Sequence, residues 1–203
     1  MNTGMHPVLK QPYVSIGPGE HYATNTDDVI STVLGSCVAV GIFDPDLKAG
    51  GLNHFMLPDE PLNKNLSATE SGRYGLKAME LLLGDLVKLG SRRRRLEAKV
   101  FGGGAFIATE EVGWRIALRN VEFAFEFLSA EGITVVSSDV GGASARRILY
   151  FPKAGRALVK ATPWTGWQLA HDEAAYSQSI ARTDHKHGSV TLFEGETVPG
   201  GVA

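Results

Sequence analysis

The chain has 203 residues, of which 43% are hydrophobic, and this is enough apolar material for one sizeable core. Its 20 lysines and arginines stand against 22 acidic residues, a formal net charge of -2, so it lacks the basic excess common in nucleic-acid-binding proteins. No stretch approaches about 18 consecutive apolar residues, which argues against a membrane-spanning helix.

Residues 1–12 are polar and contain two prolines, and they predict a loose leader. A first strand is expected near 13–16, and a second over the β-branched run 29–34. Residues 37–43 read as a buried strand and 51–58 as another. Because a cluster of turn residues separates these last two, they predict a hairpin.

Two helices are expected. Apolar residues recur at helical spacing from Tyr74 to Leu89, after a Ser67-Ala-Thr-Glu70 sequence that fits a capping box, and Gly90 provides a natural stop. The second helix is expected over 119–131, where apolar residues again follow one face.

Further strands are predicted from residue 96 into the glycines 102–104, over 133–142, and in a final hairpin made by 146–151 and 156–161. The composition changes after residue 161, so residues 162–203 are expected to form a C-terminal extension, with a short helix and then a polar tail. The order of elements predicts an α/β protein of the α+β kind, with mixed or antiparallel sheets and two main helices, rather than a doubly wound parallel sheet.

Cys37 is the single cysteine, so no internal disulfide can form, and this favours a reducing compartment, most simply the cytoplasm. The N-terminus shows no signal-peptide pattern. Cys37 follows a Gly-Ser turn, where backbone amides can lower a thiol pKa and stabilise an oxyanion. His54 lies on the other arm of the predicted hairpin, and an imidazole beside a thiol is the arrangement of a cysteine nucleophile.

An inert role is the general expectation for a lone cysteine or histidine in an apolar strand. The catalytic interpretation requires that both side chains share a face of the hairpin. That depends on the strand register, which the spacing of Cys37 and His54 leaves open.

The run TVLGSCVAVGIFDP, followed by GGLNHFMLP, resembles the signature of the chemoreceptor glutamine deamidase family, CheD. RYG (73–75), LEAKVFGGGA (96–105), RN (119–120) and DVGGASARR (139–147) fall in the family's order. The resemblance covers residues 13–161, which are then the expected deamidase domain. It implies a three-layer sandwich similar to the catalytic domains of glutamine-deamidating toxins.

The resemblance also implies the chemistry. It points to a Cys-His amidohydrolase that converts glutamines of chemoreceptors to glutamate, with Cys37 as nucleophile and His54 as general base and acid. The family's third residue is a threonine six positions before the cysteine. That position is Ser31 here, with Thr32 beside it, and the choice between the two hydroxyls stays open.

No metal or organic cofactor is implied. The expected partners are chemoreceptor cytoplasmic helices and, where one is encoded, a CheC-type phosphatase; nucleic acid is not expected. Hydrolysis of receptor glutamate methyl esters is a close variant of the same chemistry. The alternative from another functional class is a non-catalytic module that regulates receptors or the phosphatase by docking.

Three other features attract weaker interpretations. The glycines 102–104 lack the Gly-Lys-Ser/Thr of a phosphate loop, so tight turns are the better explanation. The run Arg92 to Arg95 predicts a solvated connection or a docking surface for an acidic partner. Three late histidines lack supporting ligands at metal-binding spacing: His171, His185 and His187.

Overall fold

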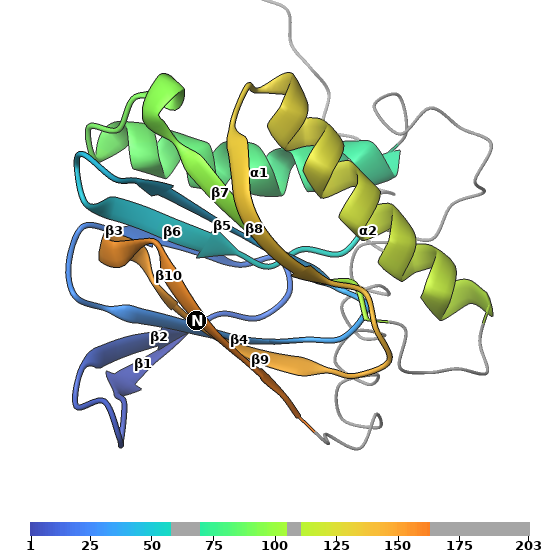
Figure 1. Cartoon of the computed structure of the whole chain (residues 1–203), viewed down its shortest axis with the longest axis horizontal. Helices are drawn as coiled ribbons and strands as arrows, with labels where there is room; N and C mark the ends of the chain where they lie inside the picture. Colours follow the sequence, from blue (N-terminus) through green and yellow to red (C-terminus); the bar gives the residue numbers. More distant parts are fainter. Residues whose placement is uncertain (58–69, 105–110, 163–203) are drawn as a thin grey trace, which may run out of the picture.

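The structure, a computed structural model, describes residues 1–57, 70–104 and 111–162. These residues form three layers (Figure 1): two helices, a five-stranded sheet beneath them, and a second five-stranded sheet on the far side. The predicted α+β class with mixed sheets and two main helices is confirmed.

The sheet farther from the helices, here called the outer sheet, contains two strands from the end of the domain. Its strands, in spatial order, are β1 (Asn2–Met5), β2 (Pro12–Ser15), β4 (Val29–Leu34), β9 (Arg146–Phe151) and β10 (Arg156–Ala161). Only β2 and β4 run parallel; the other neighbours are antiparallel. The predicted terminal hairpin is therefore confirmed, with a single 3-10 turn, Pro152–Ala154, between its strands.

The sheet beneath the helices, here called the inner sheet, contains the central hairpin. Its strands, in spatial order, are β3 (His21–Thr24), β6 (Ala49–Asn53), β5 (Val38–Asp44), β7 (Glu97–Gly102) and β8 (Thr134–Val140). β5 and β6 are antiparallel, as predicted, but β6 ends at Asn53. β7 and β8 are parallel, and a helix connects them, as a parallel crossover requires.

Helices α1 (Glu70–Lys88) and α2 (Glu111–Ala130) both cover the inner sheet (Figure 1). Both predicted helices are confirmed, although α2 starts at Glu111 instead of residue 119. The proposed capping residue Ser67 lies outside the described residues. A short 3-10 turn, Arg93–Arg95, leads from the first helix into β7.

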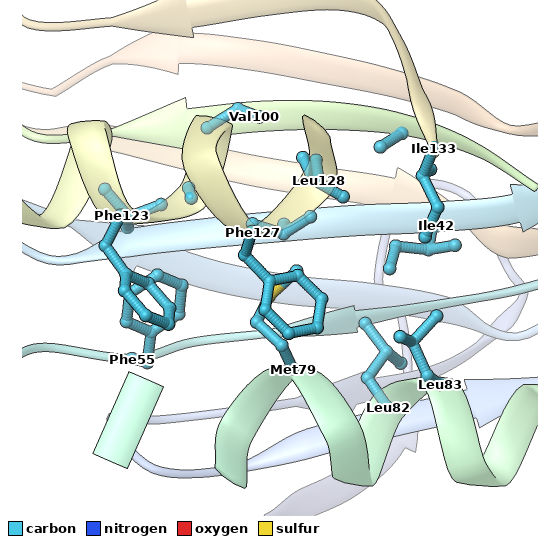
Figure 2. Close-up of a cluster of buried hydrophobic side chains, with 14 of the residues drawn as sticks. Ile42, Phe55, Met79, Leu82, Leu83, Val100, Phe123, Phe127, Leu128 and Ile133 are labelled. Atoms are coloured by element: carbon cyan, nitrogen blue, oxygen red, sulfur yellow. The ribbon is translucent and has the colours of Figure 1, made fainter. Parts of the chain in front are cut away.

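The core has two parts. The first lies between the helices and the inner sheet (Figure 2), where the Phe55 and Phe123 rings meet edge to face with centroids 5.8 Å apart. The second lies between the two sheets. Its buried members are Val14, Ile16, Ile30, Leu34, Cys37, Ala39, Leu52, Met56, Phe101, Ile148 and Tyr150. The cysteine singled out from the sequence is thus part of the core between the sheets.

The N-terminal residues depart from expectation. Residues 1–12, expected to be a loose leader, contain β1, which pairs antiparallel with β2. All four residues of β1 are exposed, so no hydrophobic alternation marks the strand in the sequence. Of the expected C-terminal extension, residues 163–203 lie outside the described part of the chain.

Candidate active site

Cys37 lies in the turn that joins β4 to β5, and its side chain is fully buried. The three successive carbonyl oxygens of this turn each accept a hydrogen bond from another segment: Gly35 from the Gly104 amide at 2.7 Å, Ser36 from Asn120 Nδ2 at 2.9 Å, and Cys37 from the Gly103 amide at 2.8 Å. The peptide planes around the thiol are therefore held by bonds from outside the turn.

The glycines at the end of β7 allow this close approach of two backbones. Gly102 and Gly103 have φ values of 104° and 62°, which side chains rarely adopt. A Cβ atom on Gly102 would collide with the Cys37 carbonyl oxygen, and one on Gly103 would collide with Val121. These glycines thus have a structural role next to the cysteine turn.

His54 directly follows β6, and its residue is 2% exposed. Its amide donates to the Glu20 carbonyl at 2.9 Å, and its carbonyl accepts from the Gly19 amide at 2.8 Å. The next residue, Phe55, exchanges two backbone hydrogen bonds with Val38, at 3.0 and 2.9 Å. Backbone hydrogen bonds to residues 19–20, and through Phe55 to β5, thus fix the backbone of the histidine.

The Val38–Phe55 pair determines the register that the sequence left open. Cys37 and His54 each directly precede one member of this pair, and the same antiparallel register runs on through β5 and β6. His54 is then opposite Ala39, and Ala39 shares the core between the sheets with Cys37. Because alternate residues of paired strands face the same way, the structure brings Cys37 and His54 to the same side of the hairpin.

A hydroxyl of the outer sheet meets the imidazole. Thr32 Oγ1 lies 2.8 Å from His54 Nδ1, and both residues are buried. Thr32 shares its face of β4 with Ile30 and Leu34, which belong to the core between the sheets. Ser31 is the neighbouring residue of the same strand, so its side chain points to the opposite face. The geometry favours Thr32 over Ser31 as the partner of His54.

The hydrogen bonds indicate the tautomer of His54. The Ile16 carbonyl can only accept, so the single O–H of Thr32 donates its hydrogen bond to that carbonyl, at 2.8 Å. Thr32 Oγ1 then accepts from His54 Nδ1–H, which leaves a lone pair on Nε2. Nε2 is buried and has no hydrogen-bond partner among the residues that the structure describes.

Burial lowers the pKa of His54 to about 4, against the opposing effects of the Ile16 carbonyl and the Glu20 charge. A buried imidazole loses the hydration that stabilises its charged form. At neutral pH His54 is therefore uncharged, and its Nε2 can accept a proton. This is the protonation state that a general base requires.

Asn120 is a site residue that the sequence reasoning did not single out, apart from quoting it within the RN pair. It is fully buried on the face of α2 that also buries Ala117 and Ala124. Its Oδ1 accepts from the Leu57 amide at 2.7 Å, and its Nδ2 donates to the Ser36 carbonyl. The available signal was a carboxamide within an otherwise apolar helix face.

The loop after β8 adjoins the glycine segment. The Gly141 amide donates to the Gly102 carbonyl at 2.9 Å. The Arg146 guanidinium, from β9, bonds Asp139 and the Gly141 carbonyl. Asp139, Gly141 and Arg146 border an open hollow beside β8 and β10. The DVGG segment is thus joined to the glycines that contact the cysteine turn.

The arginine run 92–95 is partly used within the fold. Arg95 donates two hydrogen bonds to the buried Asp44, at 2.7 and 3.0 Å. Arg93 forms an ion pair with Glu131. These contacts favour the structural interpretation for two of the four arginines.

Among the described residues, no three His, Cys, Asp or Glu side chains are grouped to hold a metal ion. His171, His185 and His187 lie outside those residues. No helix in the described part is long and apolar enough to cross a membrane.

Residues 56–161 match the family described as CheD chemotactic sensory transduction. A protein of Bordetella parapertussis named probable chemoreceptor glutamine deamidase CheD is 51% identical over 153 residues, which cover 75% of this chain and 71% of that protein. A protein of the same name from Herminiimonas arsenicoxydans is 46% identical over 177 residues, covering 87% of this chain and 86% of its own length. One from Burkholderia vietnamiensis is 42% identical over 185 residues, covering 90% and 75%.

Proposed function

This chain belongs to the CheD family, and we propose that it deamidates glutamine side chains of chemoreceptors to glutamate. Relatives that it matches over most of its length have that activity in their names. The structural observation that carries the proposal is the buried Thr32–His54 hydrogen bond. It supports an unprotonated Nε2 on the side of the hairpin where Cys37 lies.

In the first half of the proposed reaction, His54 Nε2 takes the proton of the Cys37 thiol. The sulfur then bonds to the carbonyl carbon of the glutamine side chain, and the carbonyl oxygen becomes an oxyanion. When this intermediate collapses, the carbon–nitrogen bond breaks and His54 returns the proton to the leaving nitrogen. Ammonia departs, and a thioester joins the receptor side chain to Cys37.

Backbone amides of the cysteine turn are the proposed oxyanion donors. In a planar trans peptide the N–H points away from the preceding carbonyl. The Ser36 carbonyl accepts from Asn120, so the Cys37 N–H points away from α2. The bonds on the three turn carbonyls support a preorganised donor there, since they fix the peptide planes before substrate arrives.

In the second half, His54 removes a proton from water, and the hydroxide attacks the thioester carbon. The carbon–sulfur bond breaks, the thiol recovers its proton, and glutamate is released. A receptor glutamate methyl ester would give the same thioester with methanol as the leaving group, so methylesterase activity is proposed as a side reaction. The proposed setting is the cytoplasm, where a lone thiol stays reduced.

The test uses the full chain and a glutamine-bearing cytoplasmic fragment of a chemoreceptor, with the receptor peptides followed by mass spectrometry. Amide-to-acid conversion at discrete glutamines is expected, with loss of several orders of magnitude in Cys37→Ala, because a covalent nucleophile is removed. Ser91→Ala, which removes a buried hydroxyl just after α1 and away from the cysteine turn, is the matched control and should retain activity.

Equal conversion by wild type and Cys37→Ala would overturn the cysteine mechanism. Binding of the fragment without any conversion would overturn deamidation and favour the docking module. A parallel assay with a methyl-esterified fragment measures the side reaction. Adding a CheC-type phosphatase to the same samples tests whether that protein binds this chain.

A further inference from the structure

Asn120 connects the two arms of the hairpin that carries Cys37 and His54. One end of its carboxamide accepts from the Leu57 amide at 2.7 Å, and the other donates to the Ser36 carbonyl at 2.9 Å. The chemistry of these partners fixes the orientation of the carboxamide, because an amide N–H only donates and a carbonyl only accepts. Every bond that Asn120 makes here ends on backbone.

The two anchors flank the proposed catalytic groups. Ser36 directly precedes Cys37, and Leu57 follows His54 by three residues. Between them, the Val38–Phe55 pair joins the two arms at the open end of the hairpin. A single side chain of α2 therefore bridges the cysteine turn and the segment that leaves the histidine.

The bond to Ser36 also orients a peptide plane. The Ser36 carbonyl and the Cys37 N–H belong to one planar unit and point in opposite directions. Rotation of that plane would lose the Asn120 bond and turn the Cys37 amide away from its present direction. It would also change the Ser36 ψ and Cys37 φ angles, and with them the backbone geometry beside the thiol.

We propose that Asn120 is a positioning residue for the reaction: it sets the Cys37 thiol and amide relative to His54 without touching the substrate. This inference rests on the proposed deamidation. A merely structural clamp would affect stability alone. A positioning role affects the chemical step, because small misplacements of reacting groups cost large factors in rate.

The test compares Asn120→Asp and Asn120→Ala with Asp44→Asn. Asp44 is equally buried and bonds Arg95, but it lies at the far end of β5, about 20 Å from the cysteine turn. We expect both Asn120 variants to lose roughly 10- to 100-fold in kcat with KM for the receptor fragment nearly unchanged. Asp44→Asn should lose thermal stability but keep kcat when assayed well below its melting temperature.

Asn120→Asp provides a second signature. It keeps the side-chain volume and the acceptor for Leu57, so it is the variant expected to fold. At neutral pH its second oxygen faces the Ser36 carbonyl without a proton, and the two repel each other. At lower pH a protonated carboxyl can donate there, so its kcat relative to wild type should rise as pH falls. The kcat ratio of Asp44→Asn to wild type should not rise.

Folded Asn120→Asp with wild-type kcat and pH profile would overturn the proposal, as would losses that only follow thermal stability in all three variants. A readout without receptor separates this failure from failure of the proposed function. The rate and pH dependence of alkylation of Cys37, the single thiol, should change in the Asn120 variants, because the amide beside the sulfur no longer keeps its direction. An unchanged rate and pH dependence would overturn positioning even if no deamidation were found.

Discussion

His54 Nδ1 and Thr32 Oγ1 lie 2.8 Å apart, although the two residues come from different sheets. Thr32 is in β4 of the outer sheet, and His54 directly follows β6 of the inner sheet. The hydroxyl donates its hydrogen bond to the Ile16 carbonyl, so its oxygen accepts from the imidazole N–H. The packing of the two sheets thus selects the histidine tautomer.

Thr32→Val keeps the shape of the side chain but removes this acceptor. We expect kcat for receptor deamidation to fall about 10- to 100-fold, since the tautomer and orientation of the base are no longer held. Ser31→Ala, at the neighbouring position on the other face of β4, is the matched control and should stay close to wild type. The opposite ranking of the two variants would return the hydroxyl role to Ser31.

His54 should make the fold less stable in acid. Its pKa is about 4 in the folded protein, against an ordinary value of 6.5 in the unfolded chain, so between these values the unfolded chain binds the extra proton. The contribution of the neutral imidazole to the free energy of unfolding is fully present above about pH 6.5 and is lost as the pH falls toward 4. Between pH 7.5 and 5.0 this amounts to about 2 kcal/mol.

Urea unfolding of wild type and His54→Gln at both pH values measures that contribution, because the other titrating groups are common to both proteins. The variant should show the smaller loss at pH 5.0. Parallel losses in the two proteins would contradict a depressed histidine pKa.

Two glycine substitutions should change the free energy of unfolding in opposite directions. Gly102→Ala places a Cβ atom against the Cys37 carbonyl at a φ of 104°, so it should lower the free energy of unfolding by at least about 1 kcal/mol and reduce activity. Gly84→Ala in α1 meets open space and should raise stability by up to about 1 kcal/mol through helix propensity. Urea unfolding of both variants decides this. A stable, active Gly102→Ala protein would show that the cysteine turn tolerates a shift.

The Tyr150 hydroxyl is buried without a hydrogen-bond partner in the described part of the chain, and burial raises its pKa far above the ordinary range. Tyr150→Phe should therefore leave the free energy of unfolding unchanged or raise it by about 1 kcal/mol. Tyr22→Phe is the control, because its hydroxyl donates to Asp28 at 2.9 Å and its loss should destabilise. A larger loss for Tyr150→Phe would reveal a partner for that hydroxyl.

Elements with their own periodicity could be predicted from the sequence. The apolar repeat from Tyr74 to Leu89 gave α1, and turn residues between apolar runs gave the central and terminal hairpins. The edge strands β1 and β3 were not predicted: neither shows a clear apolar alternation, and β3 pairs with β6 rather than with a strand next to it in the chain. β1 is exposed at every residue, and β3 is mostly half-buried.

The site was predictable in its residue types but not in its geometry. Cys37 and His54 were singled out by residue type and by their places on the predicted hairpin, and the family resemblance implied their roles. Their common face depends on the Val38–Phe55 pair. The choice between Ser31 and Thr32 was undecidable because the strand VISTVL has apolar residues on both faces, so alternation gives no direction.

The sheet around β4 is completed late in the order of synthesis. One of its neighbours is β9, whose residues 146–151 lie near the end of the domain. A nascent chain on the ribosome contains Cys37 and His54 long before it contains that neighbour. Until β9 has paired with β4, the strand that carries Thr32 lacks one of its partners, and Thr32 is not yet held against the imidazole. Competence is thus expected only once residues 146–151 have been made and have paired with β4.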